Sequence, residues 1–270
     1  SFDAHVKDGV AITSFLYWLK GNYKTQDVKE VYIDTKLLEF RRKDSSFIEP
    51  SFDTIAGFGS NGAIVHYRAS GASSKKIEGD NLLLLDSGGQ YLSGTTDITR
   101  TIAIGTPTAE QKHNFTLVLK GHIAIATAVF PEGTSGHQID ILARQYLWQN
   151  GLDYDHGTGH GVGSFLGVHE GPQRISKAPN EVVLMPGMII SNEPGYYKQG
   201  EYGIRIENLV VVEEAFRKNN KRFFKFSTIT CVPLDKNLID FSLLNVQEKN
   251  WLLYYHKSIN DKLSGLVDGN

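Results

Sequence analysis

The stretch MIISNEPGYYKQGEYGIRIENLVVV, residues 188–212, decides the fold. It contains two apolar runs joined by a turn rich in Gly and Tyr, and it places Glu193 at the end of the first run and Glu207 inside the second. Gly-rich turns allow strands to fold back on one another. We therefore expect a β-hairpin that brings Glu193 and Glu207 close together.

A second stretch, LLLLDSGGQYLSGTTDITRTIAIG at residues 82–105, repeats this pattern with Asp86 and Asp97. Two ordinary hairpins could share the pattern by coincidence. Arg205 argues against coincidence, because it faces the same side of a strand as Glu207 and could orient a carboxylate or contact a substrate. Four carboxylates brought together repel one another unless protons or cations intervene. The two hairpins therefore predict a pair of divalent cations.

Histidines follow in DYDHGTGHGVGSFLGVHEGP, residues 153–172, where His156, His160 and His169 stand among many glycines. Glycine allows the chain to approach a ligand closely, so we expect an irregular loop that lines a pocket. The zinc signature HExxH fails because Gly157 stands at the Glu position, and no frame gives GxGxxG. His66, in NGAIVHY, is either a site residue or a structural one. The remaining histidines are interpreted as ordinary surface or helix residues: His5, His113, His122, His137 and His256.

Composition excludes several classes of protein. The 270 residues are 40% hydrophobic and 21% charged, with a formal net charge of −2, so the chain shows no basic footprint for nucleic acid or a membrane surface. Cys231 is the single cysteine, which rules out an internal disulfide. Without a signal peptide or a long apolar span, we expect a cytoplasmic protein. Because the chain starts at Ser1 without Met, we expect a trimmed fragment or a processed product.

Periodicity predicts one compact α+β domain. We expect helices over residues 3–20, from Thr106 or Thr108 to Phe130, over 135–149 and over 248–263. Strands are expected over residues 64–67 (IVHY), 82–86, 99–105, 188–193 and 203–212.

Several motifs resemble the catalytic domain of Xaa-Pro aminopeptidases, in the pita-bread metallopeptidase family: NGAIVHY, DSGGQYLSGTTDITRT, HGTGHGVGSFLGVHEGP, SNEPGYY, GIRIEN and the closing VPLDKNLID with WLLYYH. The resemblance covers nearly all of residues 1–270, including a C-terminal tail over about 228–270. It implies a pita-bread fold, with a pseudo-twofold pair of β-hairpins around a dinuclear metal site. It also implies one or two upstream domains, absent from this chain, that help to shape the substrate pocket.

The resemblance also implies roles for individual residues. The metal ligands would be Asp86, Asp97, His160, Glu193 and Glu207, with Asp97 and Glu207 bridging the two ions. His66, His156 and His169 would be catalytic or substrate-facing histidines, and His66 would also bind substrate. Glu193 would relay a proton, while Tyr197 and Arg205 would form part of the substrate pocket.

Oxygen donors with one imidazole suit Mn(II) and also accept Co(II), Fe(II) or Zn(II). The resemblance favours two Mn(II) ions, with a metal-bridging hydroxide that attacks the carbonyl preceding proline. The expected partner is a peptide with Pro at the second position, with no nucleic acid and no membrane, and a homodimer is allowed.

Three alternatives remain open. A methionine aminopeptidase shares the five-ligand pattern but matches the histidine segment and the tail less well. A prolidase would cut only dipeptides. A non-enzymatic pita-bread binding module, like the metal-free creatinase branch, would lack metal ligands, whereas all five are present here.

Overall fold

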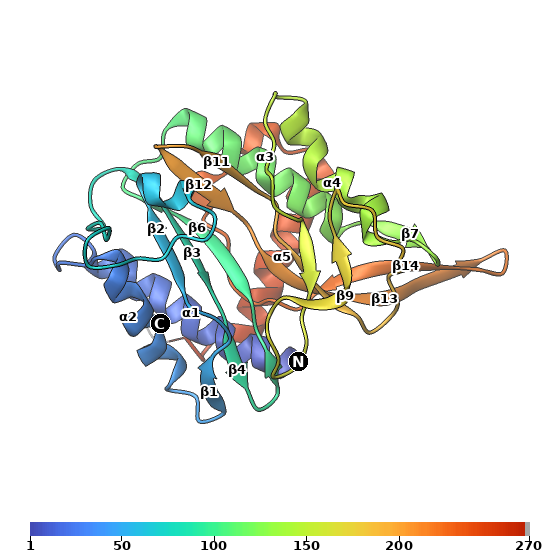
Figure 1. Ribbon diagram of the computed structural model, residues 1–270, viewed down its shortest axis with the longest axis horizontal. Helices are drawn as coiled ribbons and strands as arrows, with labels where there is room; N and C mark the ends of the chain where they lie inside the picture. Colours follow the sequence, from blue (N-terminus) through green and yellow to red (C-terminus); the bar gives the residue numbers. More distant parts are fainter. Residues whose placement is uncertain (268–270) are drawn as a thin grey trace.

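The computed structural model describes residues 1–267, in which helices alternate with antiparallel strands (Figure 1). The helices are α1 (Phe2–Asn22), α2 (Glu30–Arg41), α3 (Ala109–Ala126), α4 (Gly136–Trp148) and α5 (Val246–Leu263), with short 3-10 turns at η1 (Gly59–Ala63), η2 (Lys236–Leu238) and η3 (Phe241–Leu243). Thr108 and Ser135 cap α3 and α4 with reciprocal capping boxes. None of the helices within residues 1–267 is long and apolar enough to cross a membrane.

Four sheets are formed by the strands of residues 1–267. One has the order β2 (Ile55–Phe58), β3 (Asn81–Ser87), β6 (Ile98–Ile104). The largest has the order β7 (Val129–Pro131), β14 (Lys221–Thr228), β13 (Asn208–Lys218), β10 (Ile189–Asn192), β8 (Gly159–Gly161), β9 (Glu170–Ile175). Two small sheets join β1 (Phe47–Pro50), β4 (Gly89–Tyr91) and β5 (Gly94–Thr95), and β11 (Gly195–Lys198) with β12 (Tyr202–Arg205).

The first half of the fold is the pair β3 and β6, which places Asp86 opposite Thr99 and therefore near Asp97. Successive strand residues point to opposite faces of a sheet. One face packs on α1 and α2 in a core that includes Phe15, Leu19, Leu37, Leu83, Leu85 and Ile102. The acids belong to the other face, so burial of the apolar face fixes the direction of the carboxylates.

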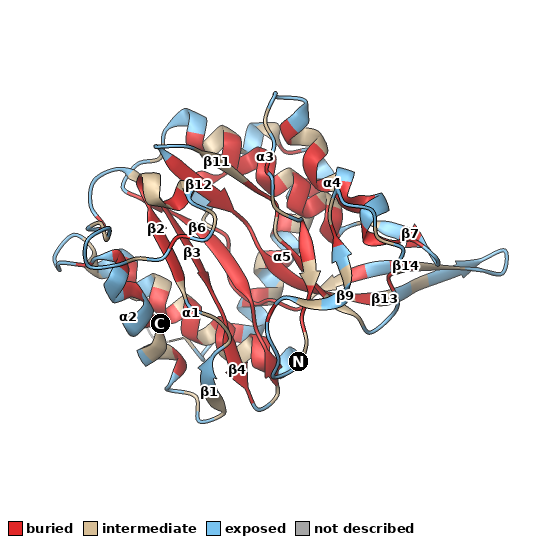
Figure 2. Cartoon of the chain, viewed as in Figure 1, coloured by how far each residue is buried: buried red, intermediate tan, exposed pale blue. Residues whose placement is uncertain are grey.

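The second half is built in the same way around β10 and β13, where Asn192 pairs with Asn208. Helices α3 and α4 cover this half through a core that includes Ile125, Ile139, Ala143, Ile190, Val210 and Phe224. The strands that carry the acids are largely buried (Figure 2). Two acid-bearing hairpins, each covered by helices, confirm the expected α+β class.

The C-terminal segment lies against both α3 and the strands. Asn245 caps α5 through Glu248, and α5 buries Leu252, Tyr255 and Ile259 in a core shared with Phe115 of α3. Residues far apart in the chain therefore meet behind the sheet.

Three sequence-based expectations are wrong. Residues 64–67 form a turn after η1 and not a strand, because the Tyr67 hydroxyl donates to Oε2 of the buried Glu30 at 2.9 Å. Helix α3 ends at Ala126, and Val129–Pro131 pairs with β14 instead of continuing the helix. The expected strand over 203–212 is interrupted after Arg205. Helix α2 has no counterpart among the expected helices.

Candidate metal centre

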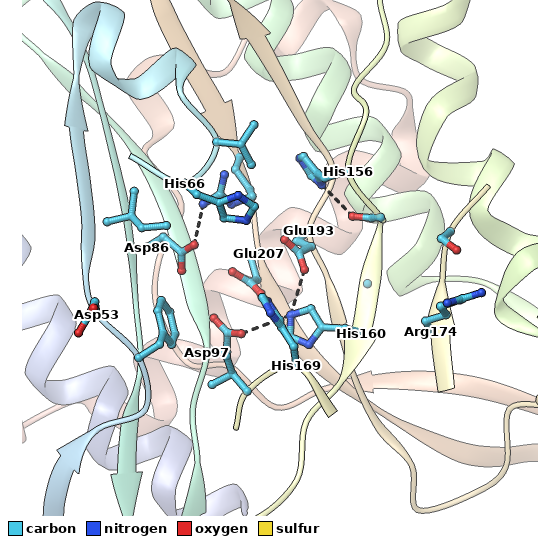
Figure 3. A pocket seen from close by; sticks show the side chains of 18 of the residues that line it. Asp53, His66, Asp86, Asp97, His156, His160, His169, Arg174, Glu193 and Glu207 are labelled. Atoms are coloured by element: carbon cyan, nitrogen blue, oxygen red, sulfur yellow. Dashed lines mark hydrogen bonds and ion pairs between the residues drawn. The ribbon is translucent and has the colours of Figure 1, made fainter. Parts of the chain in front are cut away.

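A cleft of about 590 Å³ is lined by residues from both halves of the fold. The five expected ligands lie in it, and they come from β3 (Asp86), the residue before β6 (Asp97), β8 (His160), the residue after β10 (Glu193) and the break between β12 and β13 (Glu207). Figure 3 shows these side chains pointing toward one another. The structure therefore brings together all five residues selected from the sequence.

Asp97, His160 and Glu207 form the tightest part of the cluster, since one ligand atom from each lies within 4.8 Å of the other two. The Nε2 atom of His160 is 3.4 Å from Oδ2 of Asp97 and 3.1 Å from Oε1 of Glu193. Asp86 joins from β3, and its Oδ1 is buried without a hydrogen-bond partner among residues 1–267. An unpartnered buried carboxylate oxygen is costly unless a cation or proton binds it.

The pKa values of the cluster report the same imbalance of charge. Burial, followed by the repulsion of neighbouring carboxylates, raises the pKa values of Asp97 and Glu207 well above the ordinary range. Burial would lower the pKa of His160, but the hydrogen bond to Glu193 and the negative charges of Glu193 and Glu207 together outweigh burial and raise the pKa to about 9. Burial would raise the pKa of Glu193, but His160 lowers it. Protons here balance charge that divalent ions would balance equally well, so the residues fit such ions.

Hydrogen bonds orient the ligands. His160 Nδ1 lies 3.0 Å from the carbonyl oxygen of Gly161, which directs Nε2 toward the carboxylates. The hydroxyl of Thr99 donates to Oε2 of Glu207 at 2.7 Å, and that of Ser191 donates to Oε1 of Glu193 at 2.9 Å. These hydrogen bonds fix the orientation of three of the five expected ligands, His160, Glu193 and Glu207.

The three other candidate histidines line the same cleft in different settings. The His169 ring lies 4.3 Å from that of His160 in an edge-on arrangement, and burial together with the His160 charge lowers its pKa. Both nitrogens of His156 are engaged: Nδ1 lies 2.8 Å from the Gly157 carbonyl oxygen, and Nε2 lies 2.8 Å from the Tyr197 hydroxyl. His66 is exposed, in the turn after η1.

Tyr197 and Arg205 lie behind the ligands. The Nη2 atom of Arg205 donates to Asp86 Oδ2 at 2.6 Å, and its Nη1 donates to the Tyr197 hydroxyl at 2.7 Å. Arg205 is 2% exposed and borders the cleft, whereas Tyr197 is not among the residues that line it. The observed contacts orient Asp86, so direct substrate binding by either residue stays a prediction.

Sequence reasoning missed a support for the second pair of acids. His122, interpreted as an ordinary surface or helix residue, is fully buried in α3. Its carbonyl oxygen accepts from Asn192 Nδ2 at 2.9 Å, and its Nε2 lies 3.2 Å from Asn208 Nδ2. These asparagines adjoin Glu193 and Glu207, so the motifs SNE and IEN contained the signal.

A buried ion pair, also missed, supports the first pair of acids. The Nε atom of Arg41 donates to Asp8 Oδ1 at 2.7 Å, and its Nη2 donates to the Ser87 hydroxyl at 3.0 Å. The Thr96 hydroxyl donates to Asp8 Oδ2 at 2.7 Å. Ser87 follows Asp86 and Thr96 precedes Asp97, so α1 and α2 hold both ends of this hairpin turn. His5, on α1, is likewise buried and not at the surface.

Two acid-bearing hairpins around a cleft of carboxylates and imidazoles define a pita-bread fold with a candidate metal centre. Metallopeptidase family M24 matches residues 3–214, and the C-terminal region of peptidase M24 matches residues 222–270. The chain belongs to metallopeptidase family M24.

Curated relatives and solved structures agree with this assignment. A probable Xaa-Pro aminopeptidase P of Laccaria bicolor is 51% identical over 99% of this chain, and aminopeptidase P2 of Arabidopsis thaliana is 47% identical over 99%. The chain spans 42% and 38% of these relatives. The X-prolyl aminopeptidase of Caenorhabditis elegans, described as a cytosolic enzyme with a di-nuclear active site, superposes with a TM-score of 0.92 at 38% identity, covering 97% of this chain and 43% of that one. A prolidase from Pyrococcus furiosus superposes with a TM-score of 0.68 at 30% identity, covering 84% of this chain and 62% of that one.

Proposed function

We propose that this chain is the catalytic part of an aminopeptidase that releases the N-terminal residue from peptides with proline at the second position. The observation that carries the proposal is the cluster of four carboxylates and one imidazole in the cleft of an M24 chain. The relatives named Xaa-Pro aminopeptidase support the substrate class.

The chain would hold two divalent ions through Asp86, Asp97, His160, Glu193 and Glu207. Hard oxygen donors suit manganese, and the donor set also accepts cobalt, iron or zinc. When bound, such a pair acts as a Lewis acid and lowers the pKa of water enough to provide a hydroxide nucleophile near neutral pH.

The residues of this chain position the peptide and move the proton. No hydrogen bond occupies the ring nitrogens of His169 among residues 1–267, so His169 is free to donate to the carbonyl oxygen of the scissile bond as negative charge develops there. Glu193 lies among the ligands and would carry the proton to the departing proline nitrogen. His66 lines the same cleft and would contact the substrate beside its proline.

Specificity for proline would come from the apolar wall of the cleft. Phe52, Ile55, Val65 and Val168 line it together with the ligands. A pyrrolidine ring would bury its carbons against such side chains.

Three peptide classes assayed side by side on the manganese-loaded chain test this function: Xaa-Pro tripeptides, Xaa-Pro dipeptides and Met-Ala peptides. We expect release of the N-terminal residue from the tripeptides, with Asp97→Asn as the inactive control. Cleavage of dipeptides alone would identify a prolidase, and preference for Met-Ala would identify a methionine aminopeptidase. If the longer protein to which we propose that this chain belongs binds metal and cleaves none of these peptides, it is a non-enzymatic binding module.

Location and assembly complete the proposal. The relationship to a nematode enzyme described as cytosolic supports a cytoplasmic protein. We also propose that residues 1–270 form a single catalytic domain and that upstream domains complete the substrate pocket. The assembly is proposed to be a homodimer. Fractionation of the native parent protein, followed by size-exclusion chromatography with light scattering, tests location and assembly together.

A further inference from the structure

Arg100 is a buried cation that makes no ion pair with any residue in 1–267. It lies on β6, three positions after Asp97, and is 2% exposed. A buried charge is costly unless hydrogen bonds satisfy it. Every contact of the guanidinium is to a neutral oxygen, so its role is to connect backbone and side-chain oxygens of different segments.

Some of these oxygens belong to Glu207 and to residues beside the candidate metal centre. The Nη1 atom of Arg100 donates to the carbonyl oxygens of Glu207 at 2.7 Å and Thr99 at 2.9 Å, and Nη2 donates to Asn208 Oδ1 at 2.8 Å. The Thr99 hydroxyl in turn bonds the carboxylate of Glu207. Residues 99 and 100 therefore hold both the backbone and the side chain of this ligand.

The other oxygens belong to the C-terminal region. Arg100 donates to the carbonyl oxygens of Val232 at 2.6 Å and Pro233 at 3.0 Å, and to the Tyr255 hydroxyl on α5 at 2.8 Å. The same hydroxyl lies 2.7 Å from the Val232 carbonyl oxygen, to which it donates. The ring of Tyr255 is stacked on Trp251, with 5.0 Å between centroids. These contacts fix the Tyr255 hydroxyl in a position where it accepts the hydrogen bond from Arg100.

We propose that the C-terminal region, through Tyr255 and Arg100, positions Glu207 for metal binding. Tyr255 and Arg100 are positioning residues, since neither touches the cleft. The inference rests on the dinuclear site proposed above. It assigns to α5 a role in tuning the metal centre in addition to burying the core.

The test compares Tyr255→Phe with Tyr254→Phe in the 270-residue chain. Both substitutions remove one hydroxyl from neighbouring positions of α5, but Tyr254 is 74% exposed. Manganese affinity is measured by isothermal titration calorimetry, and thermal unfolding of the metal-free chain is recorded in parallel. Because loss of one partner beyond the ligands loosens rather than removes Glu207, we expect Tyr255→Phe to weaken manganese binding about 3- to 30-fold. Tyr254→Phe should bind as the unsubstituted chain does.

Equal manganese affinity in Tyr255→Phe and the unsubstituted chain would overturn the inference, whatever happens to the melting temperature, and would leave the metal centre intact. Absence of binding by the unsubstituted chain would overturn both together. If Tyr255→Phe yields no folded protein, Arg100→Lys provides the same comparison, because lysine keeps the charge but cannot reach all these oxygens. Its control is Arg217→Lys on the exposed part of β13.

Discussion

Arg205 donates a 2.6 Å hydrogen bond from Nη2 to Oδ2 of Asp86, a residue 119 positions earlier in the chain. Its other terminal nitrogen donates to Tyr197, whose hydroxyl lies 2.8 Å from His156 Nε2. One chain of hydrogen bonds thus runs from an expected metal ligand of the first half to a histidine of the second. The two halves of the site are therefore oriented together.

Replacing Arg205 by lysine should disturb this chain. A lysine ammonium cannot reproduce the forked contacts to Asp86 and Tyr197. We expect manganese affinity to fall about 10-fold, as is typical when a partner of a metal ligand is lost. Titration calorimetry measures the change, and Arg217→Lys, whose side chain is 67% exposed, is the control. An unchanged affinity would show that Asp86 needs no such support.

The number of ions bound by each variant should distinguish ligands that hold both ions from ligands that hold mainly one. Asp97→Asn and Glu207→Gln are expected to lose both ions, because both residues belong to the tightest part of the cluster and would hold the ions there. Asp86→Asn should lose mainly one. Elemental analysis after manganese loading of the folded variants gives the count per chain. Two ions retained by Glu207→Gln would show that this carboxylate is not needed to hold them.

The histidines should differ in what their removal changes. His169→Ala and His156→Ala are each expected to lower turnover about 100-fold or more while both ions remain bound, because these rings act on substrate or on Tyr197 rather than on metal. Turnover of an Xaa-Pro tripeptide and elemental analysis are measured on the same preparations. His137→Ala, at an exposed position of α4, is the control. Lost metal in either variant would reassign that histidine as a ligand.

Metal should reverse the effect of pH on stability. Without metal, the pKa of His160 rises from 6.5 to about 9 on folding, and those of Asp97 and Glu207 are also raised. A raised folded-state pKa favours folding below the unfolded pKa, and this stabilisation is lost as pH rises through the folded pKa. The metal-free melting temperature should therefore fall by several degrees from pH 6.5 to 9. With manganese it should rise over the same interval, because the ligands bind metal when deprotonated. Thermal scans with chelator or manganese test this, and parallel curves would contradict it.

The Asp8–Arg41 ion pair should be costly to break. Asp8→Asn leaves the buried Arg41 without its counter-ion, which typically costs about 3–5 kcal/mol of unfolding free energy. Urea unfolding of the metal-free chain measures the loss. Asp3→Asn, at an exposed position of the same helix, should leave the unfolding curve unchanged. If the unfolding curve of Asp8→Asn matches that of the unsubstituted chain, the hydroxyls of Tyr91 and Thr96 hold α1 in place without the negative charge of Asp8.

Much of the site could be predicted from local sequence. Asp86 and Glu193 each end an apolar run, and the glycines between the paired acids allow the chain to turn back. The strand pattern and the turn residues therefore predict that the carboxylates lie close together. The expected helix starts, at Thr106 or Thr108 and near Ser135, agree with α3 and α4, because a capping residue acts on amides only a few residues away. These signals are local, and a single sequence contains them in full.

What the tertiary structure decided depends on partners that lie far away in the chain. IVHY has the composition of a strand, yet Tyr67 binds Glu30 on α2 and the segment turns. In the sequence, nothing distinguishes His122 from other helix histidines. Its role depends on hydrogen bonds with Asn192 and Asn208, which lie far along the chain. Arg100, Arg205 and Arg41 find their oxygens on other elements, so no spacing in the sequence reveals them. The sequence by itself determined which carboxylates and histidines would meet in one cleft, and long-range hydrogen bonding decided how each of them is held.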